Sequence, residues 1–438
     1  MEKFCAPYIS YWKRALLYCI AIAILVATPP QVWAVTVSVD TTISADTTNQ
    51  QDIDTANVDL INNATIDFST ASNAILLNST TSGNTITNNA GGTISAGRQA
   101  IGLATNSGGT INNSGTITLT GTTTAAVIQI NNSTGVTINN NAGGVISGPT
   151  STVVIRLDSG DTLVNSGSII NTDTGQSFRF AGNNSTVTLK EGSIVVGTIQ
   201  VNGGTTGSTL KIEQGFGQAY FYDITTLGTL TLEDLSGNTV VQGSAGSVGL
   251  GAQESVDELL GLRAFNLRSA LKRYSAAPAI FKEDKLWAEP FSYYSKRGTN
   301  SSVLGYENYG YGINFIYPLK QHKLDLIFTI EKSELEIDRN HDVSRTHLLA
   351  GVNATDFADL GDWKASGFFV AGTSWHNGTR DIFTNTTSSG KDNITANCNS
   401  KEIITGAHIS KTFHPDSNQR NTWKTELGFT FGYSFIED

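Results

Sequence analysis

The residue types that most often do catalytic chemistry are unevenly placed along this chain of 438 residues. All six histidines lie in its C-terminal third, at His322, His341, His347, His376, His408 and His414. Residues 35–250 therefore offer neither a histidine for a Ser-His-Asp triad nor a cysteine nucleophile. His341 and His347 fall where a strand edge or a turn is expected, and we expect solvated polar side chains at both.

Two pairs of carboxylates could still serve a glycosidase, which needs two acidic side chains at its scissile bond. They are Asp158 with Asp161, and Glu233 with Asp234. The alternative is that such pairs occur by chance on an acidic surface. Residues 35–240 carry five cations against fourteen acids, a net charge of −9, which opposes nucleic-acid binding. We therefore expect no enzyme, no catalytic or cofactor-binding residues, no metal and no nucleic-acid partner, with a hydrolase as an alternative.

A short phrase of aliphatic residues, asparagine and glycine recurs five times between residues 61 and 169. The copies begin at Ile61, Ile86, Ile111, Ile138 and Val164, so the period is 25 to 27 residues. Such a period is typical of a solenoid, and each copy is apolar, then polar, then apolar, which predicts strand, turn and strand. Stacked coils would align the aliphatics in an interior column and the asparagines in a corner ladder. We predict a parallel β-helix; leucine-rich repeats and a disordered stalk are the alternatives.

Residues 1–34 predict a signal peptide that is cleaved after Ala34. A basic start precedes an apolar run over residues 15–27, which two prolines end. That run is shorter than the ~20 residues that a membrane-spanning helix needs. We therefore expect an exported protein.

The mature chain then divides into a β-helix over 35–242, a linker over 243–284 and a strand-rich region over 285–438. Aromatic residues appear near the end of the first part, so we expect a cap near 187–242. A helix is predicted over 252–274, with a capping box at Ser255–Glu258, acids at its start and bases at its end. It is either a water-facing interdomain helix or a plug inside a barrel lumen.

Residues 285–438 predict about seven antiparallel strands. Trp423–Phe435 alternates throughout, with large apolar residues on one face and polar or small residues on the other. The same holds for two earlier strands, in which one face carries Tyr309, Tyr311, Ile313, Phe315 and Tyr317, and then Leu324, Leu326, Phe328 and Ile330. One connection, Asn377–Asn399, is expected to be a long loop. The pattern predicts a transmembrane β-barrel, with a soluble β-sandwich as the alternative.

The order of these parts resembles the monomeric (type V) autotransporters of Gram-negative bacteria. The opening residues Leu286–Phe291 and the tyrosine- and glycine-rich Gly305–Gly312 are also similar to the start of their translocator domain. The resemblance implies a right-handed β-helix as a surface-exposed passenger, a helix in the barrel lumen and a barrel in the outer membrane. Some members cut themselves between two asparagines of that helix, whereas this helix holds only Asn266.

The resemblance further implies a monomer that meets outer-membrane lipid, the barrel assembly machinery and a host-cell or bacterial surface ligand. Adhesion or aggregation is the expected function. Family barrels have about twelve strands, and seven are expected here. A truncated or degenerate autotransporter without working translocation is therefore the alternative. Cys398 has no predicted role.

Overall fold

A computed structural model describes residues 34–437 except for short gaps, and the predicted signal peptide, residues 1–34, lies outside the described part apart from Ala34. The gaps are residues 70–71, 79–81, 106–107, 122–124, 150–152, 173–174, 227–228, 242–244, 249–250, 279–284, 301–302, 320–322 and 414–422.

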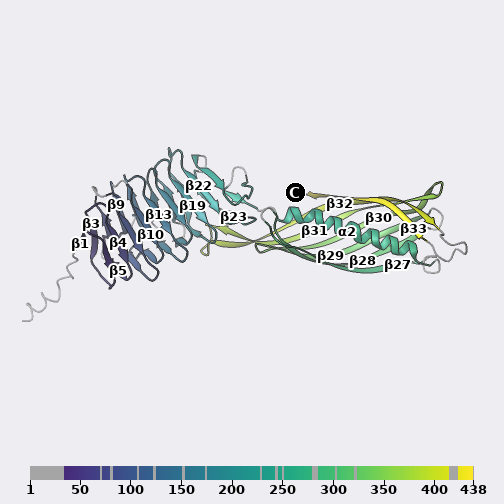
Figure 1. Ribbon diagram of the computed structural model, residues 1–438, viewed down its shortest axis with the longest axis horizontal. Coiled ribbons are helices and arrows are strands. Elements are labelled where there is room, and N and C mark those ends of the chain that lie inside the picture. The colour runs from purple at the N-terminus through teal and green to yellow at the C-terminus, as the bar shows by residue number, and fades with distance from the viewer. Residues whose placement is uncertain are drawn as a thin grey trace, which may run out of the picture. The chain divides into compact units, whose positions relative to one another are not determined.

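The described chain is all-β with a single helix, as predicted, and it forms two compact units (Figure 1). The first holds the chain up to Val187 together with Gln200–Thr209 and Gly228–Leu230. The second holds Thr188–Ile199, Leu210–Leu227 and Thr231–Asp438. No helix of the described residues is long and apolar enough to cross a membrane.

The first unit is a parallel β-solenoid of about seven turns, which confirms the predicted β-helix. Its strands fall into three parallel sheets, one strand of each sheet per coil. The first sheet contains β1 (Ala34–Val37), β3 (Gln50–Ile53), β6 (Asn73–Leu77), β9 (Gln99–Ala104), β12 (Ile128–Asn131), β15 (Val153–Leu157) and β18 (Gln176–Phe180). The second contains β2 (Thr41–Ile43), β4 (Asp59–Asn62), β7 (Thr85–Asn88), β10 (Thr110–Asn113), β13 (Thr137–Asn140) and β16 (Thr162–Asn165). The third contains β5 (Thr65–Phe68), β8 (Thr93–Ala96), β11 (Thr116–Leu119), β14 (Val145–Gly148) and β17 (Ser168–Asn171).

The solenoid core is the predicted aliphatic column. One row, fully buried and in register from strand to strand, consists of Ile66, Ile94, Ile117, Ile146 and Ile169. The register corrects two copies of the repeat, because Leu60 rather than Ile61, and Leu163 rather than Val164, align with the interior isoleucines. Successive strand residues face opposite sides, so a slip of one residue moves a side chain from the core to the surface.

The predicted asparagine ladder is present and buried. Each amide nitrogen donates to the next coil's amide oxygen at 2.7 to 2.9 Å, along Asn62, Asn88, Asn113, Asn140 and Asn165. Two coils turn through a glycine with positive φ, Gly91 at 83° and Gly143 at 82°. Glycine adopts this conformation without strain, which explains why the repeat carries it there.

Eight short strands lead to the second unit's main sheet: β19 (Thr186–Lys190), β20 (Ile194–Val196), β21 (Thr198–Val201), β22 (Thr209–Glu213), β23 (Ala219–Phe221), β24 (Ile224–Thr225), β25 (Thr231–Asp234) and β26 (Gly246–Ser247). Helix α2 (Gly251–Ala276) follows. It begins four residues before Ser255, so the prediction of a capping box at Ser255 is wrong. The glycines and serines over residues 243–251 leave the boundary undecided from sequence alone.

The main sheet has seven antiparallel strands, each paired with its neighbours in chain order. They are β27 (Trp287–Arg297), β28 (Tyr306–Leu319), β29 (Leu324–Ile337), β30 (His341–Leu360), β31 (Trp363–Thr384), β32 (Lys391–Phe413) and β33 (Trp423–Glu437). The short strands β23 and β26 add to this sheet. Strand β23 pairs with the C-terminal end of β31, past the residues of β31 that pair with β30, and β26 pairs with β23. Among the described residues, β27 and β33 do not pair with each other.

One expected loop is a hairpin. Most of Asn377–Asn399 continues β31 and β32, which pair from His376 with Cys398 out to Phe383 with Lys391. The prediction of a loop is wrong because this hairpin is rich in Thr and Asn and lacks a consistent apolar face. A ladder of backbone hydrogen bonds needs no such face.

Candidate functional site

The two faces of the seven-stranded sheet differ in chemistry. One face carries large apolar side chains that are exposed in the isolated chain, including Tyr309, Tyr311, Phe328, Leu427, Phe429, Phe431, Tyr433 and Phe435. The strongest case is β33, where Leu427 is 70% exposed and Phe429 is 66% exposed. The predicted alternation of β28, β29 and β33 is thereby confirmed. Exposed apolar patches of this extent mark a surface that another phase or molecule covers.

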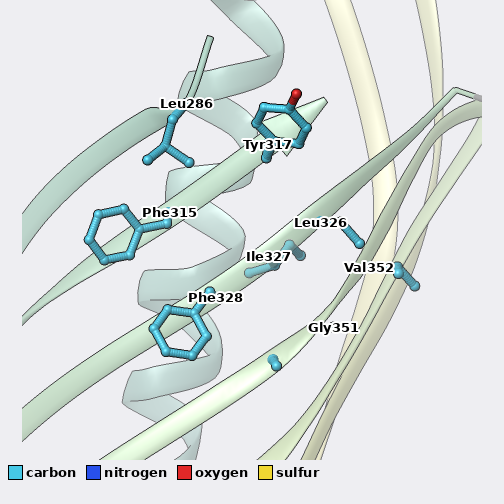
Figure 2. A pocket seen from close by; sticks show the side chains of 9 residues that line it. Leu286, Phe315, Tyr317, Leu326, Ile327, Phe328, Gly351 and Val352 are labelled. Atoms are coloured by element: carbon cyan, nitrogen blue, oxygen red, sulfur yellow. The ribbon is translucent and has the colours of Figure 1, made fainter. Parts of the chain in front are cut away.

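A shallow apolar groove of about 390 Å³ crosses this outer face. Figure 2 shows the aromatic rings of Phe315, Tyr317 and Phe328 in the groove, with the helix behind the strands. Leu286 and Val352 also line it. Its lining contains almost no polar group, so it could hold hydrocarbon but could not orient a polar substrate.

The opposite face is concave and holds helix α2. The helix contacts both edge strands, since Arg268 Nη2 lies 3.1 Å from Glu426 Oε1 of β33, and Arg273 pairs with Glu289 of β27. A sheet whose two edges reach the same helix must curve around it. The arrangement is therefore barrel-like, although the sheet is open between its edges in the described residues.

An apolar stripe along α2 packs on the concave face. Leu260, Ala264, Leu267, Leu271 and Tyr274 recur at helical spacing and are all buried. Their partners come from five strands, β28 to β32, and include Ile316, Ile327, Leu349, Phe368, Val370 and Ile404. This packing fits the prediction of a lumen plug and not that of a water-facing interdomain helix.

Beside this stripe, a buried group of charges fixes the middle of the helix. Arg263, only 3% exposed, reaches Glu331 of β29 at 3.2 Å from Nε to Oε2, and its Nη1 donates to Glu402 of β32. Both glutamates are buried as well. Tyr293 of β27 donates its hydroxyl to Glu331 at 2.6 Å. One helix residue is thus tied to strands on several sides of the curved sheet.

His347 of β30 completes this group, and its neighbours determine its tautomer. Arg263 Nη2 lies 2.7 Å from His347 Nε2, and arginine has only donors, so Nε2 is the acceptor. The ring proton therefore lies on Nδ1, which faces the Ser374 hydroxyl. His347 is 1% exposed. The prediction that His347 is a solvated residue at a strand edge is therefore wrong.

The geometry of this buried group suits holding the helix in place and does not suit catalysis. A serine, a histidine and a glutamate lie together, but the histidine Nε2 is engaged by Arg263 and the group is buried. A buried ion pair gains little net stability over apolar packing, whereas loss of one partner is strongly unfavourable. Such a group favours one position of the helix over others. Among the described residues, no three His, Cys, Asp or Glu side chains are placed to hold a metal ion.

Two further contacts hold the N-terminal end of the helix. Glu258 pairs with Arg297 at the end of β27, and Tyr306 of β28 donates its hydroxyl to Glu258 at 2.7 Å. Leu259 packs in a second apolar cluster with Leu304 and Leu335. The helix is therefore anchored near its start, at its middle and near its end.

At the tip of the β31–β32 hairpin, Asn385 binds a segment that precedes the helix in sequence. Its side chain donates to the carbonyls of Gly197 at 3.0 Å and Asp223 at 2.9 Å, and accepts from the Asp223 amide at 2.7 Å. Arg339 Nη1 lies 2.7 Å from Glu191 Oε1. These contacts join part of the predicted cap near 187–242 to the hairpins of the sheet.

The carboxylate pairs that sequence singled out are occupied by structural hydrogen bonds. Asp161 is fully buried; its two oxygens accept from the amides of Val136 at 2.9 Å and Asp158 at 2.6 Å. Burial raises the pKa of Asp161 from 3.8 to about 6, against the opposing effect of those amides. Asp158 itself accepts from the Asn132 amide at 2.7 Å.

The two carboxylates of the second pair have separate partners. Asp234 accepts from the Tyr220 hydroxyl at 2.8 Å and from the Ser236 amide at 2.8 Å. Glu233 lies 3.8 Å from Lys211. These two carboxylates therefore point to different partners.

Comparisons with known proteins do not extend this description: no protein-family model, curated protein or solved structure matches the chain. The class that the fold defines is a β-solenoid followed in sequence by a helix-filled antiparallel sheet, an architecture consistent with that of autotransporters.

Proposed function

We propose that the chain is an autotransporter, whose seven-stranded sheet lies in the outer membrane of a Gram-negative bacterium and displays the solenoid at the cell surface. The observation that carries this proposal is that the two faces of one sheet differ in chemistry. The outer face is aromatic and exposed, and the inner face holds a charged helix through buried ion pairs. Lipid outside and a polar, filled interior is the arrangement of a membrane barrel.

The soluble β-sandwich accounts for these faces less well. A sandwich would cover its large apolar face with a second sheet. In the described residues the sheet's apolar face carries no such cover, while six buried apolar residues of its concave face pack on five of one helix.

The passenger is proposed to bind and not to catalyse. Three of the four carboxylates in the two pairs accept structural hydrogen bonds, and the solenoid offers a long, polar, repetitive surface for adhesion or aggregation. The proposed partners are outer-membrane lipid, the barrel assembly machinery and a surface ligand, and the displayed protein is proposed to be a monomer.

The open sheet favours a second candidate function. This candidate is a truncated or degenerate autotransporter that is exported without working translocation. Unpaired strand edges cannot face hydrocarbon, so β27 and β33 would need partner strands in a membrane. The two candidates differ in the location of the solenoid, which is the cell surface for the first and the inside of the outer membrane for the second.

An epitope inserted at the exposed Gly203–Gly204 turn tests this choice in intact Gram-negative cells that express the full chain. Autotransporter function predicts antibody labelling of intact cells and recovery of the chain in the outer-membrane fraction. An epitope that is reached only after the outer membrane is permeabilised would contradict surface display and leave the second candidate. A periplasmic protein of known location serves as the control for membrane integrity.

A further inference from the structure

Arg345 of β30 is a buried charge without a protein partner. It is only 3% exposed and lies on the concave face of the sheet, in alternation with the less buried Ser344 and Thr346. It forms no hydrogen bond and no ion pair with any residue that the structure describes, and its Nε atom is buried. An unpaired buried charge is strongly unfavourable, because nothing replaces the water that the guanidinium group has lost.

Arg345 differs in this respect from other charged groups on the concave face. Arg263 pairs with both buried glutamates of the sheet. Asp325 accepts from the Tyr274 hydroxyl at 3.2 Å and from the Asn353 amide at 2.8 Å. The two glutamates are therefore already neutralised, and neither lies within ion-pairing distance of Arg345 among the described contacts.

Two side chains flank Arg345 directly on the neighbouring strands. Ser333 of β29 and His376 of β31 are in register with it, which places their Cβ atoms about 5 Å from its own, and both are buried. The Ser333 hydroxyl has no hydrogen bond to a described residue. His376 contacts Ser400 through Nε2 at 2.8 Å, so its Nδ1 can carry a proton and donate it. Three groups that can donate hydrogen bonds are thus neighbours in one row.

These surroundings favour an anion over a water molecule. A buried water makes about three hydrogen bonds, so one that accepted from these donors would also need acceptors for its own hydrogens. Arginine offers no acceptor, and a water would leave the charge of Arg345 uncompensated. An anion needs donors only, and its hydrogen bonds with a guanidinium group are strengthened by charge.

The ligand of such a row must be small and carry one charge. Arg345, Ser333 and His376 are each more than nine-tenths buried, which excludes a bulky group between them. A single negative charge matches the single positive charge of Arg345. The row is open to solvent at one end, because Cys398 is in register with His376 and is exposed.

We propose that Arg345, Ser333 and His376 form a binding site for a small monovalent anion such as chloride. The bound anion neutralises Arg345 and joins β29, β30 and β31 on the side of the sheet that holds helix α2. Binding at this site goes beyond the proposed function and does not depend on it.

The test uses the purified full-length chain in detergent micelles, in a buffer whose only added salt is sodium gluconate. Sodium chloride is titrated, and the line width of the chloride NMR signal reports exchange with bound chloride. The parent chain is expected to broaden this signal in a saturable way, and sodium bromide is expected to reverse the broadening by competition. Gluconate is too large for the site and should not compete.

Three variants assign the binding to this row. Arg345→Gln removes the charge and keeps a polar side chain, so it should weaken chloride binding by about ten-fold or more. Ser333→Ala is the milder change, which removes one neutral donor and should weaken binding by about two- to ten-fold. Arg339→Gln removes a charge at an exposed position of the same sheet and should bind like the parent.

Thermal melts of the parent chain at equal ionic strength give a second readout, which remains available if Arg345→Gln does not fold. Chloride should raise the melting temperature above that in gluconate, because a ligand of the folded state stabilises it. Equal melts in the two salts, no saturable broadening, broadening that bromide does not reverse, or unchanged affinity in R345Q would overturn the proposal. A chain that binds chloride but is absent from the outer membrane would contradict the proposed function alone.

Discussion

Replacement of Arg263 by methionine should destabilise the second unit strongly. The change removes the only helix cation within reach of Glu331 and Glu402 among the described residues, and these carboxylates are 0% and 3% exposed. Breaking a buried ion pair by removing one partner costs about 3–5 kcal/mol, because the remaining charge stays buried and unpaired. Methionine fills a similar volume, so little of that cost comes from a cavity.

Two companion variants isolate the electrostatic cause. Arg268→Met removes an ion pair with Glu426 in which the arginine side chain is 38% exposed, and should cost less than about 1 kcal/mol. The triple variant R263M/E331Q/E402Q removes the stranded charges and should recover most of the loss. Unfolding of the purified full chain by guanidinium, followed by tryptophan fluorescence, gives these free energies. Equal stability of R263M and R268M, or a triple variant no more stable than R263M, would show that unpaired buried charge is not the cause of the loss.

Three further predictions concern the solenoid and the outer face of the sheet. Because the pKa of Asp161 is raised to about 6, the native solenoid holds this proton more tightly than the unfolded chain, whose pKa is near 3.8. The unfolding free energy should therefore fall by about 2–3 kcal/mol as pH rises from about 4 to about 6, and Asp161→Asn should flatten that part of a pH series of thermal melts. Asn113→Ala breaks the buried ladder and should lower the unfolding free energy by about 1–3 kcal/mol. Asn63→Ala, at an exposed amide pair, should lower it by less than about 0.5 kcal/mol. Equal denaturant midpoints of the two variants would contradict the ladder's role. Phe328→Arg places a charge on the outer face and should cost about 2–4 kcal/mol in lipid, so the yield of the folded, heat-modifiable band on a gel should drop; an unchanged yield would argue for a water-facing surface.

The sequence predicted the solenoid well because its periodicity repeats every 25 to 27 residues. Each coil buries an isoleucine and pairs an asparagine at its corner, so these residues recur at regular positions in the sequence. Five copies make the pattern clear despite variation between individual copies. The one-residue error at Ile61 and Val164 arose where two aliphatics are adjacent, Leu60 with Ile61 and Leu163 with Val164. Composition cannot decide which of two neighbouring aliphatics faces inward; the register of the adjacent coil does.

The site in the sheet was harder to predict because its partners are distant in sequence. Arg263 meets Glu331 and Glu402 across 68 and 139 residues, and no local pattern encodes such a pairing. A signal did exist for Glu331, which occupies the inward face of a strand whose outward face is apolar, whereas Glu402 lies inward on a strand whose outward face is mixed. An inward charge in a barrel-like strand needs a partner, and the basic half of helix α2 was the available source. The surroundings of His347 were predicted wrongly because they come from β31, β32 and the helix.

We propose that the aromatic face of β33 meets lipid while its other face turns toward helix α2. Single-cysteine variants from Leu427 to Tyr433, in a chain whose native cysteines are replaced by serine, can carry a fluorophore sensitive to polarity. In bilayers containing brominated lipid, we expect strong quenching at Leu427, Phe429, Phe431 and Tyr433 and weak quenching at the residues between them. Quenching that is weak at every position, or that shows no alternation along the strand, would contradict a membrane-embedded sheet.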